Sequence, residues 1–213
     1  MITTVAKVDR LNPDPSVISE AGRIIKSGGL VAFPTETVYG LGADALNPEA
    51  VRKIYEAKGR PPEKALILHV DGISQAERYV ELNDTALKLM RKFWPGPLTL
   101  VLPARDTVPP ITRGGLSTAA VRMPDDAIAQ AIITSVGTPI AAPSANLSGR
   151  PSPVDAEMVW GDMAGRIDMI IDGGSVKIGT PSTIIDITQP ERISLVRLGV
   201  LRFEEIVNAC DNI

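Results

Sequence analysis

Two polar clusters in this 213-residue chain combine residue types that bind and transfer anionic groups. In the first cluster, Lys58 and Arg60 flank a glycine and are followed by two prolines. An arginine guanidinium forks onto pairs of phosphate or carboxylate oxygens, whereas a lysine ammonium acts as a point charge. A basic loop of this kind is suited to a polyanion such as a triphosphate.

The second cluster, PSANLSGRPSP at 143–153, directly follows an apolar stretch at 139–142. Its small residues let a ligand approach the backbone, and Ser144, Asn146 and Ser152 offer hydroxyl and amide groups for hydrogen bonds. Ligands of open α/β sheets bind beyond the carboxyl ends of strands, which favours a binding role. The same residue types also form ordinary turns that lead into a helix, so this segment alone leaves both interpretations open.

A third group of polar residues follows the apolar strand predicted at 30–33. After the break at Pro34, three hydroxyls come in quick succession at Thr35, Thr37 and Tyr39. His69, the single histidine of the chain, lies on a strand predicted at 65–70. These residues could shape a small polar pocket, although Tyr39 and His69 could equally be packed in the core.

Several familiar site types are not expected. The run GLGADA at 40–45 matches the dinucleotide pattern G-x-G-x-x-A, but it is too far from the preceding strand, and the next helix begins only near Pro48. The chain holds no P-loop, no C-x-x-C, no H-E-x-x-H and no G-x-S-x-G. With one cysteine and one histidine, neither a structural zinc site nor a serine triad is expected.

The composition is that of an ordinary globular protein, with 44% apolar and 22% charged residues. A net charge of −3 argues against a general nucleic-acid binder, which would carry a basic excess. A lone cysteine cannot form an internal disulfide, which favours a reducing compartment. No apolar run approaches the roughly 18 residues of a membrane span. We therefore expect a cytoplasmic protein that does not act at a membrane.

The spacing of apolar residues predicts helices that alternate with short strands. Alternation of this kind indicates an α/β fold, here a single domain over 1–213 whose twisted, mixed, largely buried β-sheet is flanked by helices. Asn47, just before a proline, is the expected N-cap of the second helix. The predicted helices are 15–26, 48–57, 84–93, 125–136, 154–163 and 203–209, and the predicted strands are 2–8, 30–33, 65–70, 98–102, 119–121, 139–142, 168–171, 183–187 and 194–196.

Seven motifs, in order along 29–199, together resemble the YrdC-type threonylcarbamoyl-AMP synthases. They are PTETVYGLG, KGRP with the following LILHV, WPGPLTLVL, AVRMP, PSANLSGRPSP, PSTIID and VRLG. The K-x-R…S-x-N signature of that family is met by Lys58, Arg60, Ser144 and Asn146. The chain departs from the family pattern at Ala65, where proline is frequent. Because the sequence ends at Ile213, it resembles the short, single-domain form with the YrdC-like fold.

The resemblance implies an enzyme, a nucleotidyltransferase that joins L-threonine, bicarbonate and ATP into threonylcarbamoyl-AMP and pyrophosphate. Partner transferase proteins would then move the threonylcarbamoyl group to an adenosine of tRNA, while direct tRNA binding by this chain stays open. Such chemistry depends on positioning and charge neutralisation rather than on a side-chain nucleophile. Mg²⁺ is expected as the cofactor, held mainly by the nucleotide rather than by a protein site.

The resemblance also assigns roles to individual residues. For Arg197 a surface ion pair is the alternative, and Lys64 is a weaker candidate because lysines in loops are usually solvated. The implied catalytic residues are Lys58, Arg60, Ser144 and Asn146; ATP binding adds Lys64, Thr118, Ser152 and Arg197; and L-threonine binding is implied for Thr35, Thr37, Tyr39, His69, Arg122, Ala142 and Ser182.

Two other functions fit parts of the pattern. A locally basic sheet face could hold RNA without chemistry, but the acidic total charge and 4% aromatic content count against it, since single-stranded RNA is commonly gripped by stacking. A paralogue could make a carbamoyl-adenylate for another acceptor, as in hydrogenase-maturation carbamoyltransferases. Those chains carry zinc-finger cysteines, and this sequence does not.

Overall fold

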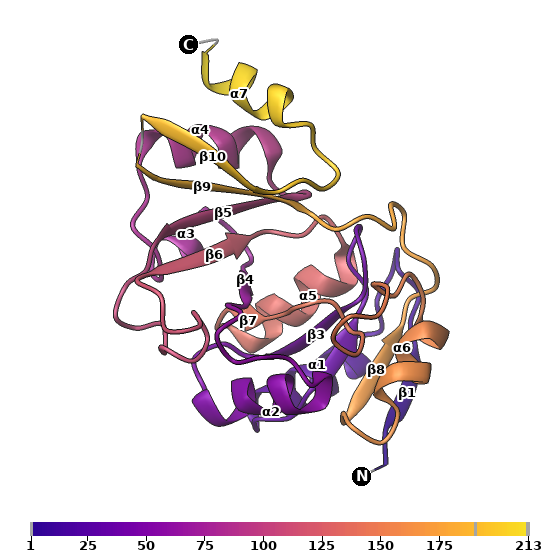
Figure 1. Cartoon of the computed structure of the whole chain (residues 1–213). Coiled ribbons are helices and arrows are strands. Elements are labelled where there is room, and N and C mark those ends of the chain that lie inside the picture. The colour runs from indigo at the N-terminus through magenta and orange to yellow at the C-terminus, as the bar shows by residue number, and fades with distance from the viewer. Residues whose placement is uncertain (1, 190, 212–213) are drawn as a thin grey trace.

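The computed structural model describes residues 2–189 and 191–211 and has the α/β fold that the sequence predicts, with one ten-stranded mixed sheet (Figure 1). The strand order is β1-β8-β2-β3-β7-β4-β6-β5-β9-β10. The strands are β1 (Thr4–Lys7), β2 (Val31–Phe33), β3 (Gly40–Asp44), β4 (Ile67–His69), β5 (Leu98–Pro103), β6 (Thr118–Arg122), β7 (Ile140–Ala141), β8 (Met169–Asp172), β9 (Thr183–Gln189) and β10 (Arg192–Arg197).

Five of the helices begin after a short polar side chain that caps them. Asn47 accepts hydrogen bonds from the backbone of Glu49 and Ala50, which confirms the predicted N-cap. Asp126 caps its helix in the same way, through the backbone amides of Ile128 and Ala129. The helices are α1 (Pro15–Lys26), α2 (Pro48–Lys58), α3 (Ile73–Ala76), α4 (Asp84–Phe93), α5 (Ala127–Val136), α6 (Ala156–Met163) and α7 (Phe203–Asp211), and the bounds of α1 and α4 agree with the prediction.

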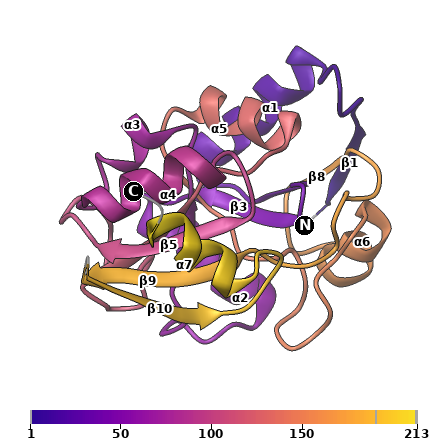
Figure 2. The ribbon, with the colours of Figure 1, turned by 90° about the horizontal axis from the view of Figure 1, so that it is seen from above.

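The sheet separates two apolar cores because successive side chains of a strand point to opposite faces. In β2, Val31 and Phe33 pack with α1 and α5. Ala32, between them, joins the larger core formed with α2, α4 and the central strands. Figure 2 shows α1 beside α5, with α2 on the other side of β3. The sheet is therefore buried on both faces along its centre, as predicted.

Strand β3 and the short helix α3 are the elements that the sequence prediction missed. Glycine-rich GLGAD has a low strand propensity, so no strand was predicted there. Gly42 is needed for packing, since a Cβ there would lie 2.6 Å from the Phe33 ring and 2.9 Å from the Ile140 side chain. The GLGADA run is thus a sheet strand and its continuation, and the expectation that it is not a phosphate-binding turn is confirmed.

The strand order brings the predicted polar segments together. Strand β3 pairs with β2 and β7, and β7 pairs in turn with β4, which lies next to β6. An isolated bridge between Gly40 and Ser144 ties the segment after β7 to the start of β3. The turn after β2, His69 at the end of β4 and the loop after β7 therefore meet at one place.

The loop 103–117 packs beside the same place. The backbone amide of Leu66 donates to the carbonyl of Thr112 at 2.9 Å, and the Thr112 hydroxyl donates to the carbonyl of Ala45 at 2.8 Å. A Cβ on Gly114 would lie 2.6 Å from the Glu63 carbonyl oxygen, so this loop rests directly on the backbone that leads into β4. Among the described residues, the structure contains no helix long and apolar enough to cross a membrane.

Candidate active site

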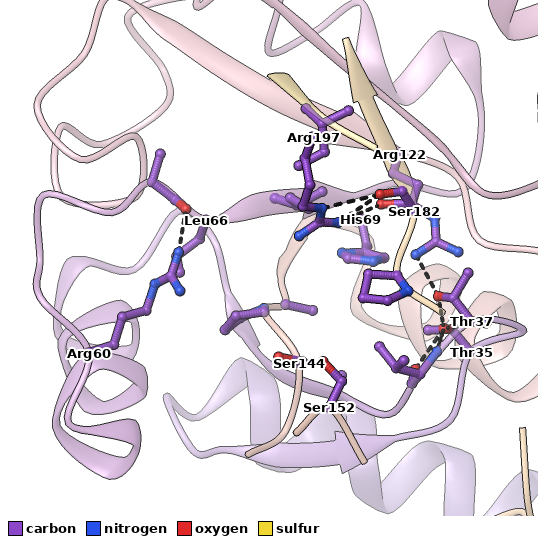
Figure 3. Close-up of a pocket in the computed structure, with 18 residues that line it drawn as sticks. Thr35, Thr37, Arg60, Leu66, His69, Arg122, Ser144, Ser152, Ser182 and Arg197 are labelled. Carbon is purple, nitrogen blue, oxygen red and sulfur yellow. Dashed lines mark hydrogen bonds between the residues drawn. The ribbon is translucent and has the colours of Figure 1, made fainter. Parts of the chain in front are cut away.

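A pocket opens where these segments meet, and ten of the fifteen predicted site residues line it (Figure 3). The others that line it are mostly apolar or small, among them Val38, Gly40, Pro143 and Ile184. The structure thus assembles side chains that are up to 162 positions apart in the sequence. The ten predicted residues are Thr35, Thr37, Arg60, His69, Arg122, Ala142, Ser144, Ser152, Ser182 and Arg197.

The turn between β2 and β3 forms one wall of the pocket. The Thr35 hydroxyl donates to the carbonyl of Val38 at 2.7 Å and lies 2.9 Å from the Thr37 hydroxyl. These short contacts fold the chain back on itself, as serine and threonine turns do. Both threonines then line the pocket, while Glu36, between them, is buried.

Arg122, at the end of β6, is only 4% exposed and has three partners from two segments of the chain. Its Nε donates to the carbonyl of Gly96 at 3.1 Å, its Nη1 donates to the Thr37 hydroxyl at 3.0 Å, and its Nη2 lies 2.6 Å from Oε1 of Glu36. Burial lowers the pKa of Arg122, and the Glu36 carboxylate opposes that shift. A guanidinium has five N–H donors, so two remain for a ligand in the pocket.

Arg197 is fixed at the pocket by the backbone of Ser182. Its Nη2 donates to the Ser182 carbonyl at 2.8 Å, and the Ser182 hydroxyl in turn lies 2.8 Å from the Thr99 hydroxyl. Gly199 allows this approach, because a Cβ at that position would lie 2.3 Å from the Pro181 carbonyl oxygen. The glycine of the VRLG motif is therefore required for steric reasons, and Arg197 forms no ion pair with the residues that the structure describes.

Arg60 lies at the far end of the pocket from Arg122, with Arg197 between them in the view of Figure 3. Helix α2 ends at Gly59 in the left-handed conformation, with φ of 58°, which turns the chain toward the pocket. The Arg60 guanidinium donates to the carbonyls of Lys64 and Ala65, both at 3.2 Å. Among the described residues, neither Arg60 nor Arg197 forms an ion pair with a carboxylate. This end of the pocket is therefore suited to an anion.

Lys58 and Asn146 lie beneath the pocket rather than in its lining. The Lys58 side chain is buried, and its Nζ donates to the carbonyls of Ser144 and Asn146. Burial, followed by the charge of Arg60, lowers the pKa of Lys58 to about 8. The Asn146 amide donates to the carbonyls of Leu147 and Arg150, while its buried Oδ1 has no protein partner among the described residues. The K-x-R and S-x-N parts of the family signature are thus hydrogen-bonded to each other, and Lys58 holds Ser144 in position.

Three further predicted residues also lie outside the lining. The Tyr39 hydroxyl donates to the Gly174 carbonyl at 2.7 Å and accepts from the Gly173 amide at 3.2 Å, so this side chain is bonded to the loop at 173–174. Lys64 is exposed in the loop after Arg60. Thr118 begins β6, opposite Pro103. Their predicted binding roles stay predictions.

Glu36 is the functional residue that sequence reasoning missed. The signal available for it was a single acidic residue inside a hydroxyl-rich turn, between an apolar strand and a run of small residues. An acidic residue in such a turn is ordinarily taken as solvated. Its burial follows from the fold of the turn, which the sequence pattern does not specify.

His69 is buried beside Arg122, and its Nδ1 has no partner in the described part of the chain. Burial, reinforced by the charge of Arg122, lowers the pKa of His69 to about 3. The imidazole is therefore neutral near pH 7, with one ring N–H donor and one ring-nitrogen acceptor. It is a polar contact for a ligand rather than a further cation.

The pocket thus has Arg60 at one end, Arg122 with its carboxylate partner at the other, and Arg197 and small hydroxyl residues between them. The family model for Sua5/YciO/YrdC, described as "Telomere recombination", matches residues 23–199. The chain therefore belongs to the Sua5/YciO/YrdC family.

Three relatives show how far the similarity extends. The chain is 52% identical to the threonylcarbamoyl-AMP synthase of Pyrococcus abyssi over 187 residues, which is 87% of this chain and 55% of that protein. Its structure matches that of P. abyssi Sua5 complexed with L-threonine, with a TM-score of 0.95 and 48% identity, over 99% of this chain and 62% of the other. It also matches E. coli YciO, with a TM-score of 0.89 and 26% identity, over 96% of this chain and the whole of YciO.

The chain spans a little over half the length of the first relatives that it matches, 55% of the P. abyssi protein and 58% of the Bacillus subtilis one. The similarity confirms the predicted family and its fold.

The buried neutral His69 predicts how stability depends on pH. The unfolded chain takes up a proton at His69 below its ordinary pKa of about 6.5, whereas the folded protein does so only near pH 3. Stability is therefore lost as the pH falls through this window, by roughly 2 kcal/mol between pH 7 and 5. Urea unfolding at both pH values should show that His69→Asn loses less stability than the parent protein. Equal losses would contradict a neutral, buried His69.

Proposed function

We propose that this chain is a threonylcarbamoyl-AMP synthase that uses L-threonine, bicarbonate and ATP. The observation that carries the proposal is the charge pattern of the pocket. Arg60 at one end and Arg197 in the middle have no carboxylate partner among the described residues, whereas Arg122 at the other end is paired with Glu36. A triphosphate suits the first end, and an amino acid suits the second. The relative from P. abyssi, whose structure is a complex with L-threonine, supports the assignment.

In the proposed reaction, the amine of threonine attacks the carbon of bicarbonate-derived carbon dioxide, and a proton leaves the nitrogen. An oxygen of the resulting carbamate then attacks the α-phosphorus of ATP. The bond between the α-phosphorus and the bridging oxygen breaks, and pyrophosphate leaves with the electron pair. No protein nucleophile takes part, so catalysis rests on orientation and on neutralising the charges of phosphate and carbamate.

Each part of the pocket has a task in this scheme. Arg122 would fork onto the threonine carboxylate, with the Thr35, Thr37 and His69 side chains close by. Arg60 and Arg197 would hold phosphate oxygens. Lys58, through its bonds to the loop carbonyls, would keep Ser144 beside the reacting groups. The product would pass to transferase proteins that modify tRNA.

The first test is the product of the reaction. We expect ATP to be converted to pyrophosphate and an adenylate only when L-threonine and bicarbonate are both present. Chromatography of the nucleotides, with each substrate omitted in turn, measures this directly. Release of ADP, or turnover without threonine, would contradict the proposal.

Mg²⁺ is proposed to enter as part of the nucleotide. The described residues contain no group of three histidine, cysteine or acidic side chains that could hold a metal ion. The phosphate oxygens of ATP would therefore supply most of its ligands, and the ion would offset the charge of the triphosphate. We expect excess EDTA to abolish adenylate formation and added Mg²⁺ to restore it. Full activity in EDTA would show that no divalent cation is needed.

The assignment of Arg60 and Arg122 to different ligands is testable by binding. Arg122→Lys keeps the charge but loses the fork, so it should weaken threonine binding far more than ATP binding. Arg60→Ala should do the reverse. Truncating one partner of a desolvated charge pair typically costs about 2–5 kcal/mol, which calorimetry resolves.

A matched control for this experiment is Arg52→Ala, because Arg52 lies on α2 near Arg60 but forms an exposed ion pair with Glu49. It should change neither affinity by more than about twofold. Should both pocket variants weaken one ligand and leave the other untouched, the division of the site is wrong.

A further inference from the structure

The Glu36 carboxylate lies behind the wall of the pocket and has a single charged contact. Glu36 is 3% exposed and does not line the pocket. Its Oε1 lies 2.6 Å from Nη2 of Arg122, and apart from this ion pair neither oxygen has a partner among the described residues. A carboxylate in such a place acts strongly on neighbouring charges, because little water screens it.

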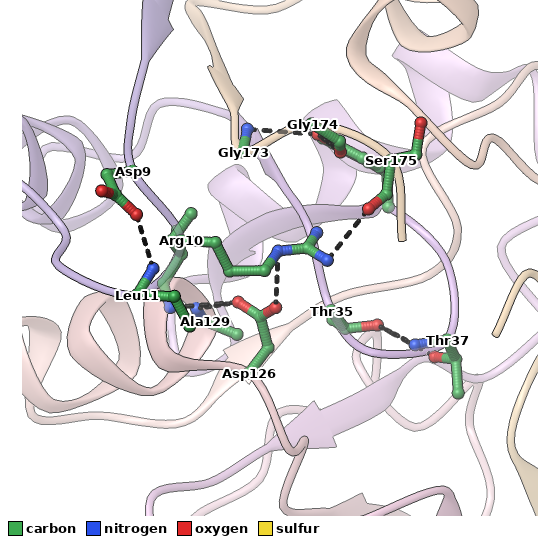
Figure 4. Close-up of polar contacts among 12 residues, drawn as sticks. Asp9, Arg10, Leu11, Thr35, Thr37, Asp126, Ala129, Gly173, Gly174 and Ser175 are labelled. Atoms are coloured by element: carbon green, nitrogen blue, oxygen red, sulfur yellow. Dashed lines mark hydrogen bonds and ion pairs between the residues drawn. The ribbon is translucent and has the colours of Figure 1, made fainter. Parts of the chain in front are cut away.

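A second buried ion pair accounts for the other charges nearby. Arg10 Nε lies 3.3 Å from Oδ2 of Asp126, whose side chain is 1% exposed, and Arg10 Nη1 donates to the carbonyl of Ser175 at 3.0 Å. Figure 4 shows this pair next to the turn of Thr35 and Thr37. Arg10 and Asp126 neutralise each other, so the charge of Glu36 is left to balance Arg122.

The pocket is therefore divided by charge. At the amino-acid end, Arg122 and Glu36 sum to zero. Arg60 at the other end, and Arg197 between the two ends, have no carboxylate partner in the part of the chain that the structure describes. His69 adds no charge near neutral pH. The Arg60 end is therefore suited to an anion, whereas the charge of Arg122 is already balanced by Glu36.

We propose that Glu36 makes the amino-acid end of the pocket select a zwitterion over a simple carboxylate anion. This inference rests on the proposed function, because it assumes that an amino acid binds at Arg122. A bare carboxylate would leave the pair with a net negative charge in a poorly solvated site. A ligand that also carries an ammonium group restores the balance. Glu36 is thus a specificity-determining residue that acts without touching the substrate.

The experiment compares two ligands that differ by this one charge. L-Threonine and 3-hydroxybutyrate, which is threonine without its amino group, are each titrated by NMR into the parent protein and into Glu36→Gln. Glutamine keeps the shape of the side chain and removes its charge. We expect the preference for threonine over 3-hydroxybutyrate to fall by about tenfold or more in Glu36→Gln. A change in the orientation of Arg122 would affect both carboxylates alike, so it would cancel in this ratio.

Two further variants complete the test. Glu36→Asp keeps the charge and should keep the ratio, even if both affinities fall. Glu20→Gln removes a carboxylate whose ion pair with Arg23 is exposed on α1, and it should change nothing.

The outcomes separate the two proposals. If the parent protein does not bind threonine, the proposed function fails. If it binds threonine and the ratio is the same in Glu36→Gln, only the role of Glu36 is overturned. If Glu36→Gln does not fold, the other proteins still decide: equal binding of both ligands by the parent, or loss of the ratio in Glu36→Asp, overturns the inference.

Discussion

The buried guanidinium of Arg122 is the group on which the rest of the pocket depends. A charge that is 4% exposed is stable in a protein only when its desolvation is offset by partners on several sides. Here the partners come from two parts of the chain: the Gly96 carbonyl before β5, and the Thr37 hydroxyl and Glu36 carboxylate in the turn after β2. The arginine therefore fixes the turn after β2 against the start of β5 and the end of β6. Loss of one partner would leave a buried charge uncompensated and would also move the wall of the pocket.

The opposite side of the pocket is built on a second buried cation with a different task. Lys58 donates to two backbone carbonyls of the loop after β7, so its ammonium group stabilises the conformation of that loop. Arg60, two residues further on, emerges after the left-handed Gly59 and lines the pocket. The K-x-R spacing thus gives one cation that shapes the loop and one that faces the cavity. Together with the Arg122–Glu36 pair, this arrangement places an arginine without a carboxylate partner among the described residues at one end of the pocket and a charge-balanced arginine at the other.

The sequence predicted the parts of the structure that local patterns determine. The helix 15–26 follows from its apolar face and terminal glycines, and Asn47 before a proline predicted a cap that the structure confirms. The elements that were missed depend on packing between distant residues. Strand β3 is rich in glycine because Phe33 and Ile140 lie against Gly42, and no local signal reports that contact. The site shows the same limit of local patterns. The motif residues were found through the family resemblance. The burial of Glu36 and of Tyr39 depends on the folded turn and on the loop at 173–174, which local patterns do not predict.

We propose that one carboxylate-binding arginine, Arg122, and two phosphate-binding arginines, Arg60 and Arg197, share a single pocket. This proposal is tested most directly by a crystal structure of the protein with L-threonine and a non-hydrolysable ATP analogue. We predict that the threonine carboxylate lies within hydrogen-bond distance of the two remaining donors of Arg122, and that the phosphates lie on Arg60 and Arg197. A threonine carboxylate bound to Arg197, or phosphates on Arg122, would contradict it.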